Sequence, residues 1–369
     1  MEQSVNRDSQ KTIPGRVNCR TRGSALILVL WVLGLLSMLV ASFAFEAHIE
    51  SRLTSFYRDR TKAEYLARSG LDVAELLVAK MSRIQGTERD EAKAGSDIWY
   101  DPAFQLRQGG TVSVVHDLAE AGVGQGLIRL SITPEPARRN INKLADQTQA
   151  SDETWERIFD VGGIPQEMWP TLIDSFYDWT DEDDTPRPDG AETEDYYANL
   201  DKPYRARNST NLNTVAELAL IKGFTQDILQ GGTLSTGMFE SDKVVMSGIA
   251  DMLTTYGDVK VNINAASARV LRTLPDVDAE MAAYIVSQRE NWVDSTGGER
   301  RGFKSEGDLL AMVPDFPPHA VDLCSFGFEE SGIFRITSTG DLNGVLRTIW
   351  CIVRFSGGQF TVLRWREDD

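Results

Sequence analysis

The chain has 369 residues, which is enough for two or three compact units. Hydrophobic residues make up 41% of the sequence and charged residues 25%, as in a globular protein. The 38 Lys and Arg residues are outnumbered by 55 Asp and Glu residues, so the formal net charge is −17, which argues against a surface that binds nucleic-acid phosphates. Solubility, cationic partners and calcium all remain open as reasons for this acidity.

The first predicted element is an uncharged apolar run, residues 24–45, which follows an arginine-rich leader, residues 1–23. At about 1.5 Å of rise per residue this run reaches about 33 Å, enough to cross the hydrocarbon core of a bilayer. Because Lys and Arg remain on the cytoplasmic side, we expect a single-pass protein with its leader inside and the rest exported. No small-residue cleavage site follows the run, whereas Gly23, a residue suited to cleavage, precedes it.

Beyond the membrane, apolar residues recur with a 4-3 spacing from Ile49 to Ile84, which predicts one helix from about residue 24 to 84. Ala63 and Ala67 in the middle of this helix permit close approach of another element. Packing on the chain's own sheet and contact with sister subunits, which would also involve Phe56, are both open. Period-2 alternation predicts strands in five segments, residues 111–118, 127–133, 333–338, 345–355 and 360–365.

A long helix packed on an antiparallel sheet is an α+β arrangement, here interrupted by a large insertion that we predict to be all-α. The insertion contains the pattern Asn-x-Asn three times, at residues 140–142, 211–213 and 262–264, each before a helix-like run. We expect the second Asn of each triplet to be a helix N-cap. The repeated unit predicts stacked helical hairpins of the helix-hairpin-helix or SAM-like type.

The third of these units is similar to the helix-hairpin-helix of DNA-uptake proteins. In that motif a glycine-rich hairpin places backbone N–H groups against a phosphate, but here the hairpin carries Asp276 and Asp278 instead. We therefore expect no nucleic acid as a partner. A membrane-anchored extracytoplasmic module that binds DNA for uptake remains the alternative function.

Residues 178–195 form an acidic loop with nine carboxylates and one cation. A solvated run is the ordinary interpretation of such a segment. Trp179 and the nearby tyrosines argue for order, and the alternating oxygen-bearing residues suit a hard cation such as calcium. Pro186 stands where an EF-hand needs Gly, so we expect a calcium loop of another fold. The candidate calcium ligands are carboxylates in and beside the alternating pattern: Asp181, Asp183, Asp184, Asp189, Glu192 and Asp195. Thr185 and the Arg187 carbonyl complete the pattern.

Cys324 and Cys351 would both lie outside the cytoplasm, where a disulfide is permitted; a bridge and two buried thiols are both open. Catalysis is not indicated, because the three histidines, His48, His116 and His319, lie far apart in the sequence and no metalloprotease, hydrolase-elbow or phosphate-loop motif is present. We expect a protein that is not an enzyme.

Taken together, these residues resemble the K family of minor pseudopilins of type II secretion systems. The resemblance rests on Arg22-Gly23-Ser24-Ala25-Leu26, on the acidic block DWTDEDDTPRPDGAETEDYY, and on YRARNSTNLNTVAELAL, VNINAAS and VLRWRE. It implies a pilin-like fold, cleavage after Gly23 by prepilin peptidase, methylation of the new N-terminus at Ser24, and calcium in the insertion. The implied parts are a leader (1–23), a membrane segment (24–45), a pilin-like α+β part (46–139 and 332–369) and two inserted helical domains (140–257 and 258–331).

The resemblance also implies a location and partners. Proteins of this family lie in the inner membrane with their bulk in the periplasm, and they cap the tip of a pseudopilus with the I and J minor pseudopilins, above the major pseudopilin. The assembly helps to drive folded proteins through an outer-membrane pore. Most pilins carry Glu at the fifth mature position, which is Leu28 here. A lone Glu in the bilayer is costly, so Leu28 is expected to mark a subunit at the tip.

Overall fold

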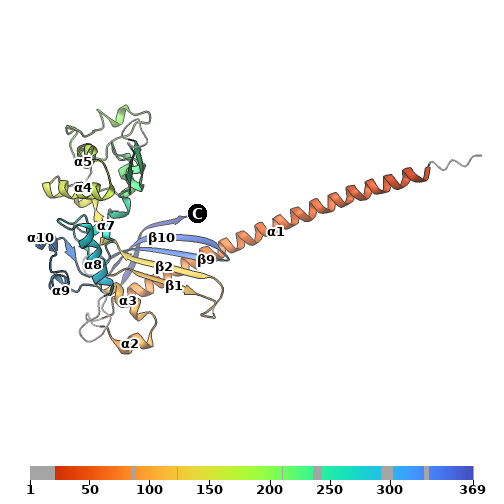
Figure 1. Ribbon diagram of the computed structural model, residues 1–369, viewed down its shortest axis with the longest axis horizontal. Helices are drawn as coiled ribbons and strands as arrows, with labels where there is room; N and C mark the ends of the chain where they lie inside the picture. The colour runs from red at the N-terminus through yellow and green to blue at the C-terminus, as the bar shows by residue number, and fades with distance from the viewer. Residues whose placement is uncertain are drawn as a thin grey trace, which may run out of the picture. The chain divides into compact units, whose positions relative to one another are not determined.

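The computed structural model describes residues 21–84, 89–122, 124–209, 211–235, 243–291, 302–327 and 332–368 (Figure 1). The chain divides into two compact units, residues 1–59 and 60–369. Residues 1–20 of the predicted leader, with Cys19, lie outside the described residues.

Helix α1 (Thr21–Met81) is one continuous helix of 61 residues. In the second unit its apolar side is buried, because Ala63, Ala67 and Leu77 are 0% exposed. Phe56, in the first unit, is 48% exposed. The predicted helix is therefore confirmed, with its end at Met81 rather than at residue 84.

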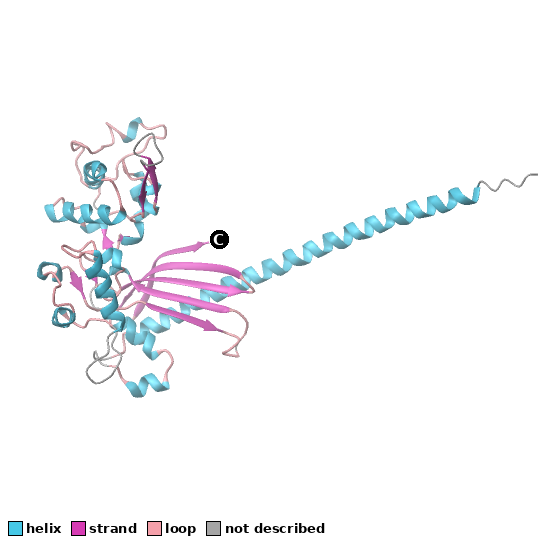
Figure 2. Cartoon of the chain, in the orientation of Figure 1, coloured by secondary structure: helices cyan, strands magenta, loops and turns pink. Residues whose placement is uncertain are grey.

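Five strands form one antiparallel sheet in the order β1-β2-β9-β10-β11 (Figure 2). All five were predicted from alternation, and they are β1 (Val112–Asp117), β2 (Leu127–Pro134), β9 (Ile333–Leu342), β10 (Val345–Ser356) and β11 (Gln359–Asp368). Ile132 pairs with Ile336, which pairs with Cys351, so one row of buried side chains crosses the three central strands. This buried face is where the sheet meets a helix.

The C-terminal part of α1 packs directly on the sheet. A Cβ built on Gly340 of β9 would lie 2.0 Å from the Ala63 carbonyl oxygen, so only glycine permits this approach. Leu77 and Met81 of α1 belong to the same hydrophobic cluster as Ile132 and Ile336. Ala63 and Ala67 are thus buried within the chain itself rather than left free for sister subunits. Two short helices, α2 (Glu91–Ser96) and α3 (Tyr100–Arg107), follow α1.

The insertion lies between β2 and β9, and in Figure 1 its helices gather at one end of the sheet. Its α-helices are α4 (Gln149–Gly162), α5 (Trp169–Thr180), α6 (Gln226–Gln230), α7 (Ala268–Leu271), α8 (Ala279–Asn291), α9 (Glu306–Met312) and α10 (Pro318–Val321). In the described part of the insertion, six short 3-10 turns accompany them: η1 (Glu135–Ala137), η2 (Ile141–Lys143), η3 (Gln166–Met168), η4 (Tyr197–Asn199), η5 (Val215–Leu220) and η7 (Ala250–Met252). Its buried apolar residues, from Ile141 to Cys324, form one cluster.

The expectation of an all-α insertion is wrong in one respect, because the described part also holds three two-stranded sheets. They pair β3 (Arg139–Asn140) with β6 (Leu253–Thr254), β4 (Gly232–Ser235) with β5 (Lys243–Met246), and β7 (Val261–Asn262) with β8 (Cys324–Ser325). The first and third pairs are parallel and join the beginning of a helical segment to its end. Such two-residue strands have no periodicity that a sequence could reveal.

The prediction that the second Asn of each triplet caps a helix is also wrong. The cap of α4 is Thr148 and that of α7 is Ser267. Instead, the side chain of Asn142 accepts a hydrogen bond from the Leu212 N–H at 2.7 Å and donates to the Leu212 carbonyl at 3.0 Å. Asn264 does the same to Phe303, at 2.7 and 2.8 Å. The insertion therefore contains two similar modules, residues 139–254 and 261–325, each closed by an asparagine bridge and a parallel strand pair.

Buried polar contacts fix the insertion to the sheet. Glu135 is 0% exposed and accepts two hydrogen bonds from Arg335 of β9, at 2.6 and 3.0 Å, and one from Thr254 of β6 at 2.6 Å. On the other module, the Asn262 and Asn264 side-chain amides donate to the carbonyls of residues 109 and 108. A buried carboxylate that accepts three hydrogen bonds from two strands makes the connection rigid.

Candidate functional site

The acidic loop is folded rather than solvated, because aromatic side chains anchor both of its ends. Trp179, near the end of α5, is 3% exposed and packs edge-on against Tyr197, with ring centroids 5.1 Å apart. The Asn208 N–H donates to the Trp179 carbonyl at 3.1 Å, so a third segment closes over the loop. The carboxylates that follow α5 are thereby held in fixed positions.

Three of the six candidate ligands converge. Carboxylate oxygens of Asp181, Asp183 and Glu192 all lie within 4.8 Å of one another. Oxygens that bind one calcium ion at 2.3–2.6 Å lie about 5 Å apart or less, so this spacing fits a single ion. Glu192 is only 1% exposed, and such a position is rare for a carboxylate without a partner.

Several acceptor oxygens around this point have no donor. The Asp181 Oδ1, both carboxylate oxygens of Glu192 and the Asn208 Oδ1 are buried and make no hydrogen bond within the described part of the chain. A buried acceptor without a donor is costly, and oxygen atoms of this kind are the ligands that calcium prefers. The donor set therefore fits a calcium ion.

The pKa values of Glu192 and Asp181 also favour a bound cation. Burial, and then the nearby charges of Asp178 and Asp181, raise the pKa of Glu192 to about 7. Burial, and then the Asp183 charge, raise the pKa of Asp181. Without a cation, the folded protein thus resists ionisation of this cluster.

Asp178, which was not among the candidate ligands, is a buried residue of α5 that holds the backbone of the acidic loop. It is 0% exposed, and its carboxylate accepts from the Arg187 N–H at 3.1 and 3.3 Å. Burial raises the pKa of Asp178. A Cβ on Gly190 would lie 1.9 Å from its Oδ2, so the loop can pass here only with glycine.

The other three candidate ligands, Asp184, Asp189 and Asp195, are not part of this group of three, and each makes a contact within or beside the loop. Asp195 accepts from the Glu192 N–H at 2.7 Å, and Asp184 accepts from the Asn208 side chain at 3.2 Å. The Asp189 N–H donates to Asp174 at 3.2 Å. The Arg187 carbonyl accepts from the Gly190 N–H at 3.1 Å, and the Thr185 N–H donates to Asp183 at 2.8 Å. Of the six carboxylates taken from the linear pattern, the structure thus brings three together.

Asn208 is a residue beside these carboxylates that the sequence did not single out. It has a left-handed backbone, with φ of 48°, and its amide reaches Asp184 from 24 residues away. Asn208 lies in the YRARNSTNLNT stretch on which the family resemblance partly rests. The sequence of this stretch does not indicate that Asn208 contacts Asp184.

The membrane helix matches its prediction within the described residues. One helix is long and apolar enough to cross a membrane, and its apolar N-terminal side chains are unburied. Leu28 is 65% exposed in this helix. The backbone at Gly23 and Ser24 is helical. These features fit a single-pass inner-membrane anchor.

The two cysteines are free and buried in the structure, which corresponds to the alternative of two thiols and not to a bridge. Cys324 belongs to the hydrophobic cluster of the insertion and Cys351 to that of the helix and sheet. Burial raises the pKa of Cys324 to about 12 and that of Cys351 to about 11. Both are inert thiols at neutral pH.

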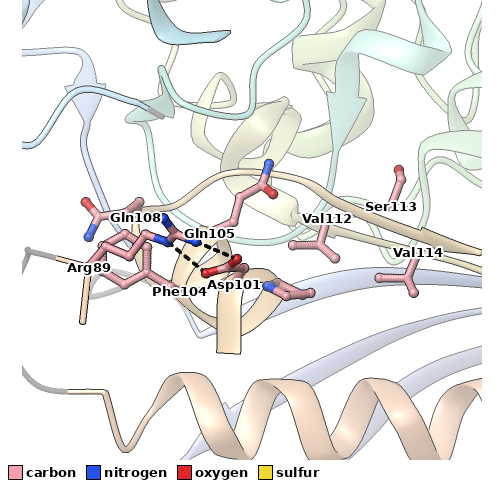
Figure 3. Close-up of a pocket in the computed structure, with 9 residues that line it drawn as sticks. Arg89, Asp101, Phe104, Gln105, Gln108, Val112, Ser113 and Val114 are labelled. Carbon is pink, nitrogen blue, oxygen red and sulfur yellow. Dashed lines mark hydrogen bonds and ion pairs between the residues drawn. The ribbon is translucent and has the colours of Figure 1, made fainter. Parts of the chain in front are cut away.

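A cavity of about 270 Å³ beside α3 lacks a catalytic arrangement (Figure 3). Its charged lining residues, Arg89 and Asp101, form a two-hydrogen-bond pair at 2.9 Å. Neither His116, which packs against Trp99, nor His319, which pairs with Asp276 at 2.9 Å, lines this cavity. Nucleophile and base are therefore not brought together at this place.

The hairpin between α7 and α8 is used for local structure. The Asp278 carboxylate accepts from the Met281 N–H at 2.8 Å, at the start of α8. Asp276 has a positive φ of 55°, and its carboxylate is the one that pairs with His319. The hairpin thus presents carboxylates where a phosphate-binding hairpin presents free N–H groups, and their negative charge opposes phosphate binding.

The family model described as type II secretion system protein K matches residues 137–231, which include the acidic loop. The type II secretion system protein K of Pseudomonas aeruginosa is 26% identical over 296 residues, 78% of this chain and 75% of the relative. The putative protein K of Escherichia coli K12 is 26% identical over 219 residues, 58% of this chain and 61% of the relative.

A solved structure supports the fold. The crystal structure of the GspK–GspI–GspJ complex from enterotoxigenic Escherichia coli contains a chain that matches with a TM-score of 0.52 and 16% identity. The match covers 87% of this chain and 99% of that one. At this identity the likeness concerns the fold alone, an α+β structure with a long N-terminal helix on an antiparallel sheet.

The long apolar helix and the α+β fold fit a single-pass anchored protein of the pilin type. The matching family model and both curated relatives are described as protein K of type II secretion systems, so the chain is similar to the K family of minor pseudopilins. Members of this family are structural components of a protein-transport machine.

Proposed function

We propose that this chain caps the tip of a periplasmic pseudopilus together with I-type and J-type minor pseudopilins, above the major pseudopilin. In this role it supports export of folded proteins across the outer membrane and catalyses no reaction. The observation that carries the proposal is the pairing of an uncharged segment of α1, residues 24–45, with a large inserted head. Support for the partners comes from the relative in the GspK–GspI–GspJ complex.

Leu28 favours a position of this subunit at the end of the fibre. A carboxylate in the apolar helix needs a cationic partner, which in a fibre is the N-terminal amine of a neighbouring subunit. A subunit with no neighbour above it has no such partner, so an apolar side chain costs less there. Leu28→Glu is expected to leave cleavage after Gly23 intact, because it does not change the cleaved bond.

Processing is tested by the mass of the N-terminal peptide of membrane-extracted protein. Cleavage by prepilin peptidase after Gly23 and methylation predict a start at methylated Ser24. A start at Met1 would contradict the pseudopilin route. The inner-membrane location with the bulk in the periplasm follows from the same experiment, combined with protease protection in spheroplasts.

We also propose that Asp181, Asp183, Glu192 and the Asn208 side chain hold a structural calcium ion. When bound, the ion would supply the positive charge that the unpartnered oxygens of these residues lack. The residues themselves come from the end of α5, the acidic loop and the segment that covers it, so a shared ion would fasten three segments. Asp184, Asp189 and Asp195 would hold the loop in shape.

The proposed position is tested by co-purification and by secretion. A strain that lacks this chain is expected to regain export of its secreted proteins with the wild-type chain, and the purified chain is expected to bring down the I and J types. Normal export without the chain would contradict the proposal. Tight DNA binding at low salt would instead favour the uptake alternative.

A further inference from the structure

A cavity of about 420 Å³ lies between the two modules of the insertion. Its wall includes Arg139 and Lys143 from the first module, and Pro275 and His319 from the second. The acidic loop contributes no residue to this wall, so the cavity is separate from the calcium cluster.

Arg139 of β3 is buried in this wall without a counter-ion. It is 3% exposed, and it donates from Nε to the Thr273 hydroxyl at 2.9 Å and from Nη2 to the Thr273 carbonyl at 2.8 Å. Its Nη1 has no hydrogen-bond partner among the described residues, and none of their carboxylates pairs with it. Its pKa is lowered to about 10 by burial, so the guanidinium is charged at neutral pH. The Cys324 thiol beside it is neutral, because burial raises its pKa to about 12.

The carboxylates of the wall are already occupied. Asp146 accepts from the hydroxyls of Thr148 and Ser151, and Glu153 pairs with Arg157 at 3.1 Å. Asp276 pairs with His319 at 2.9 Å. None of them neutralises Arg139, and a buried charge without a partner is strongly unfavourable.

Two other features of the wall favour a negative ligand. Lys143 is exposed at the cavity and, in the described part of the chain, has no ion-pair partner. The N-terminus of α4, a helix of 14 residues, reaches the wall at Thr148, Ala150 and Ser151. The positive end of a helix attracts anions.

We propose that this cavity binds an oxyanion, a sulfate, phosphate or carboxylate group, between Arg139 and Lys143. The group would neutralise the buried guanidinium and join the two modules of the insertion, since Arg139 already bonds to Thr273 of the second module. The volume exceeds that of one such group, so a small molecule that carries it also has room.

The test is calorimetric titration of the full chain in detergent, with calcium held constant and ionic strength matched with sodium chloride. Sodium sulfate and sodium acetate are the two probes, and they distinguish a tetrahedral oxyanion from a carboxylate. We expect saturable binding of one equivalent of at least one probe. Lys143→Ala should weaken it about five- to tenfold, because it removes one charge-assisted hydrogen bond.

Lys202→Ala is the matched control, because Lys202 is also an exposed lysine of the insertion but does not line the cavity. It should bind as the wild type does. Absence of saturable heat with both probes would overturn the proposal. Saturable binding that Lys143→Ala leaves unchanged would place the anion elsewhere and overturn it as well.

Discussion

Replacement of Glu192 by Gln is expected to have opposite effects with and without calcium. Glu192 is buried within 4.8 Å of two other carboxylates. At that distance two charges repel by about 3.5 kcal/mol at an effective dielectric constant of about 20. The change to Gln removes this repulsion and keeps the shape of the side chain. In the presence of calcium, the same change removes a charged ligand of the proposed ion.

The size and the sign of the expected change in folding stability follow from the pKa of Glu192. The pKa of Glu192 is raised from 4.5 to about 7 in the folded protein, so the folded state holds a proton that the unfolded chain has lost. Without calcium, stability is therefore greatest below pH 4.5 and decreases as the pH rises to 7. The full effect above pH 7 is about 3 kcal/mol, or about 5 °C in melting temperature for a domain of this size.

The assay is thermal unfolding of the full chain in detergent at pH 8 and pH 5, with excess chelator or millimolar calcium. In chelator at pH 8, Glu192→Gln should melt about 5 °C above the wild type, and at pH 5 the difference should shrink to about 1 °C, because most of the loss occurs between pH 5 and pH 7. In calcium at pH 8 the order should reverse. Glu194→Gln, a change at an exposed neighbour, is the control and should follow the wild type throughout. A variant that is destabilised equally in chelator and in calcium would refute the reasoning.

Four further outcomes are expected. Calcium affinity should fall about tenfold per pH unit below pH 7, where protons compete for Glu192, and a pH-independent affinity in titrations would exclude this carboxylate as a ligand. Glu135→Gln should lower the free energy of unfolding by about 1.5–3 kcal/mol in denaturant titration, because it removes the charge of a buried carboxylate that accepts two hydrogen bonds from Arg335. Asn264→Ala should cost about 2–3 kcal/mol in the same assay, since it leaves the Phe303 backbone unbonded. Alkylation of Cys324 and Cys351 should be absent in the native protein and complete after denaturation without reductant; a requirement for reductant would reveal a bridge.

The parts of the fold that were predicted correctly are those with local periodicity. The 4-3 spacing of α1 and the alternation of the five strands are properties of each segment by itself, and a single buried face selects them. The insertion into the sheet could be predicted as well, because the strands on both sides of it show this alternation. The two-residue strands of the insertion carry no such period, so they could not be predicted.

The asparagine triplets show where local reasoning fails. An Asn that caps a helix and an Asn that bridges two backbone segments have the same sequence context, since both precede a helix. Only the position of Leu212 or Phe303, many residues further on, decides between them. The repeat itself was recognisable, whereas its role was not.

The convergence of three carboxylates could be expected from the sequence only in part, for a similar reason. Asp181 and Asp183 are near neighbours in the chain, and Glu192 returns to them through a loop whose glycine and prolines indicate a turn. Asn208 and Asp178 join through tertiary contacts that involve buried aromatic residues. The separation of Cys324 and Cys351 into two hydrophobic clusters likewise depends on packing, which the spacing of two cysteines does not contain.

The most direct test of the central claim is the position of this chain on the pseudopilus. Pseudopili that carry an epitope tag on this chain can be sheared from cells, labelled with gold and counted by electron microscopy. The account predicts one label at one end of each fibre, in equal number with the I and J types. Labels at regular intervals along the fibre would contradict it.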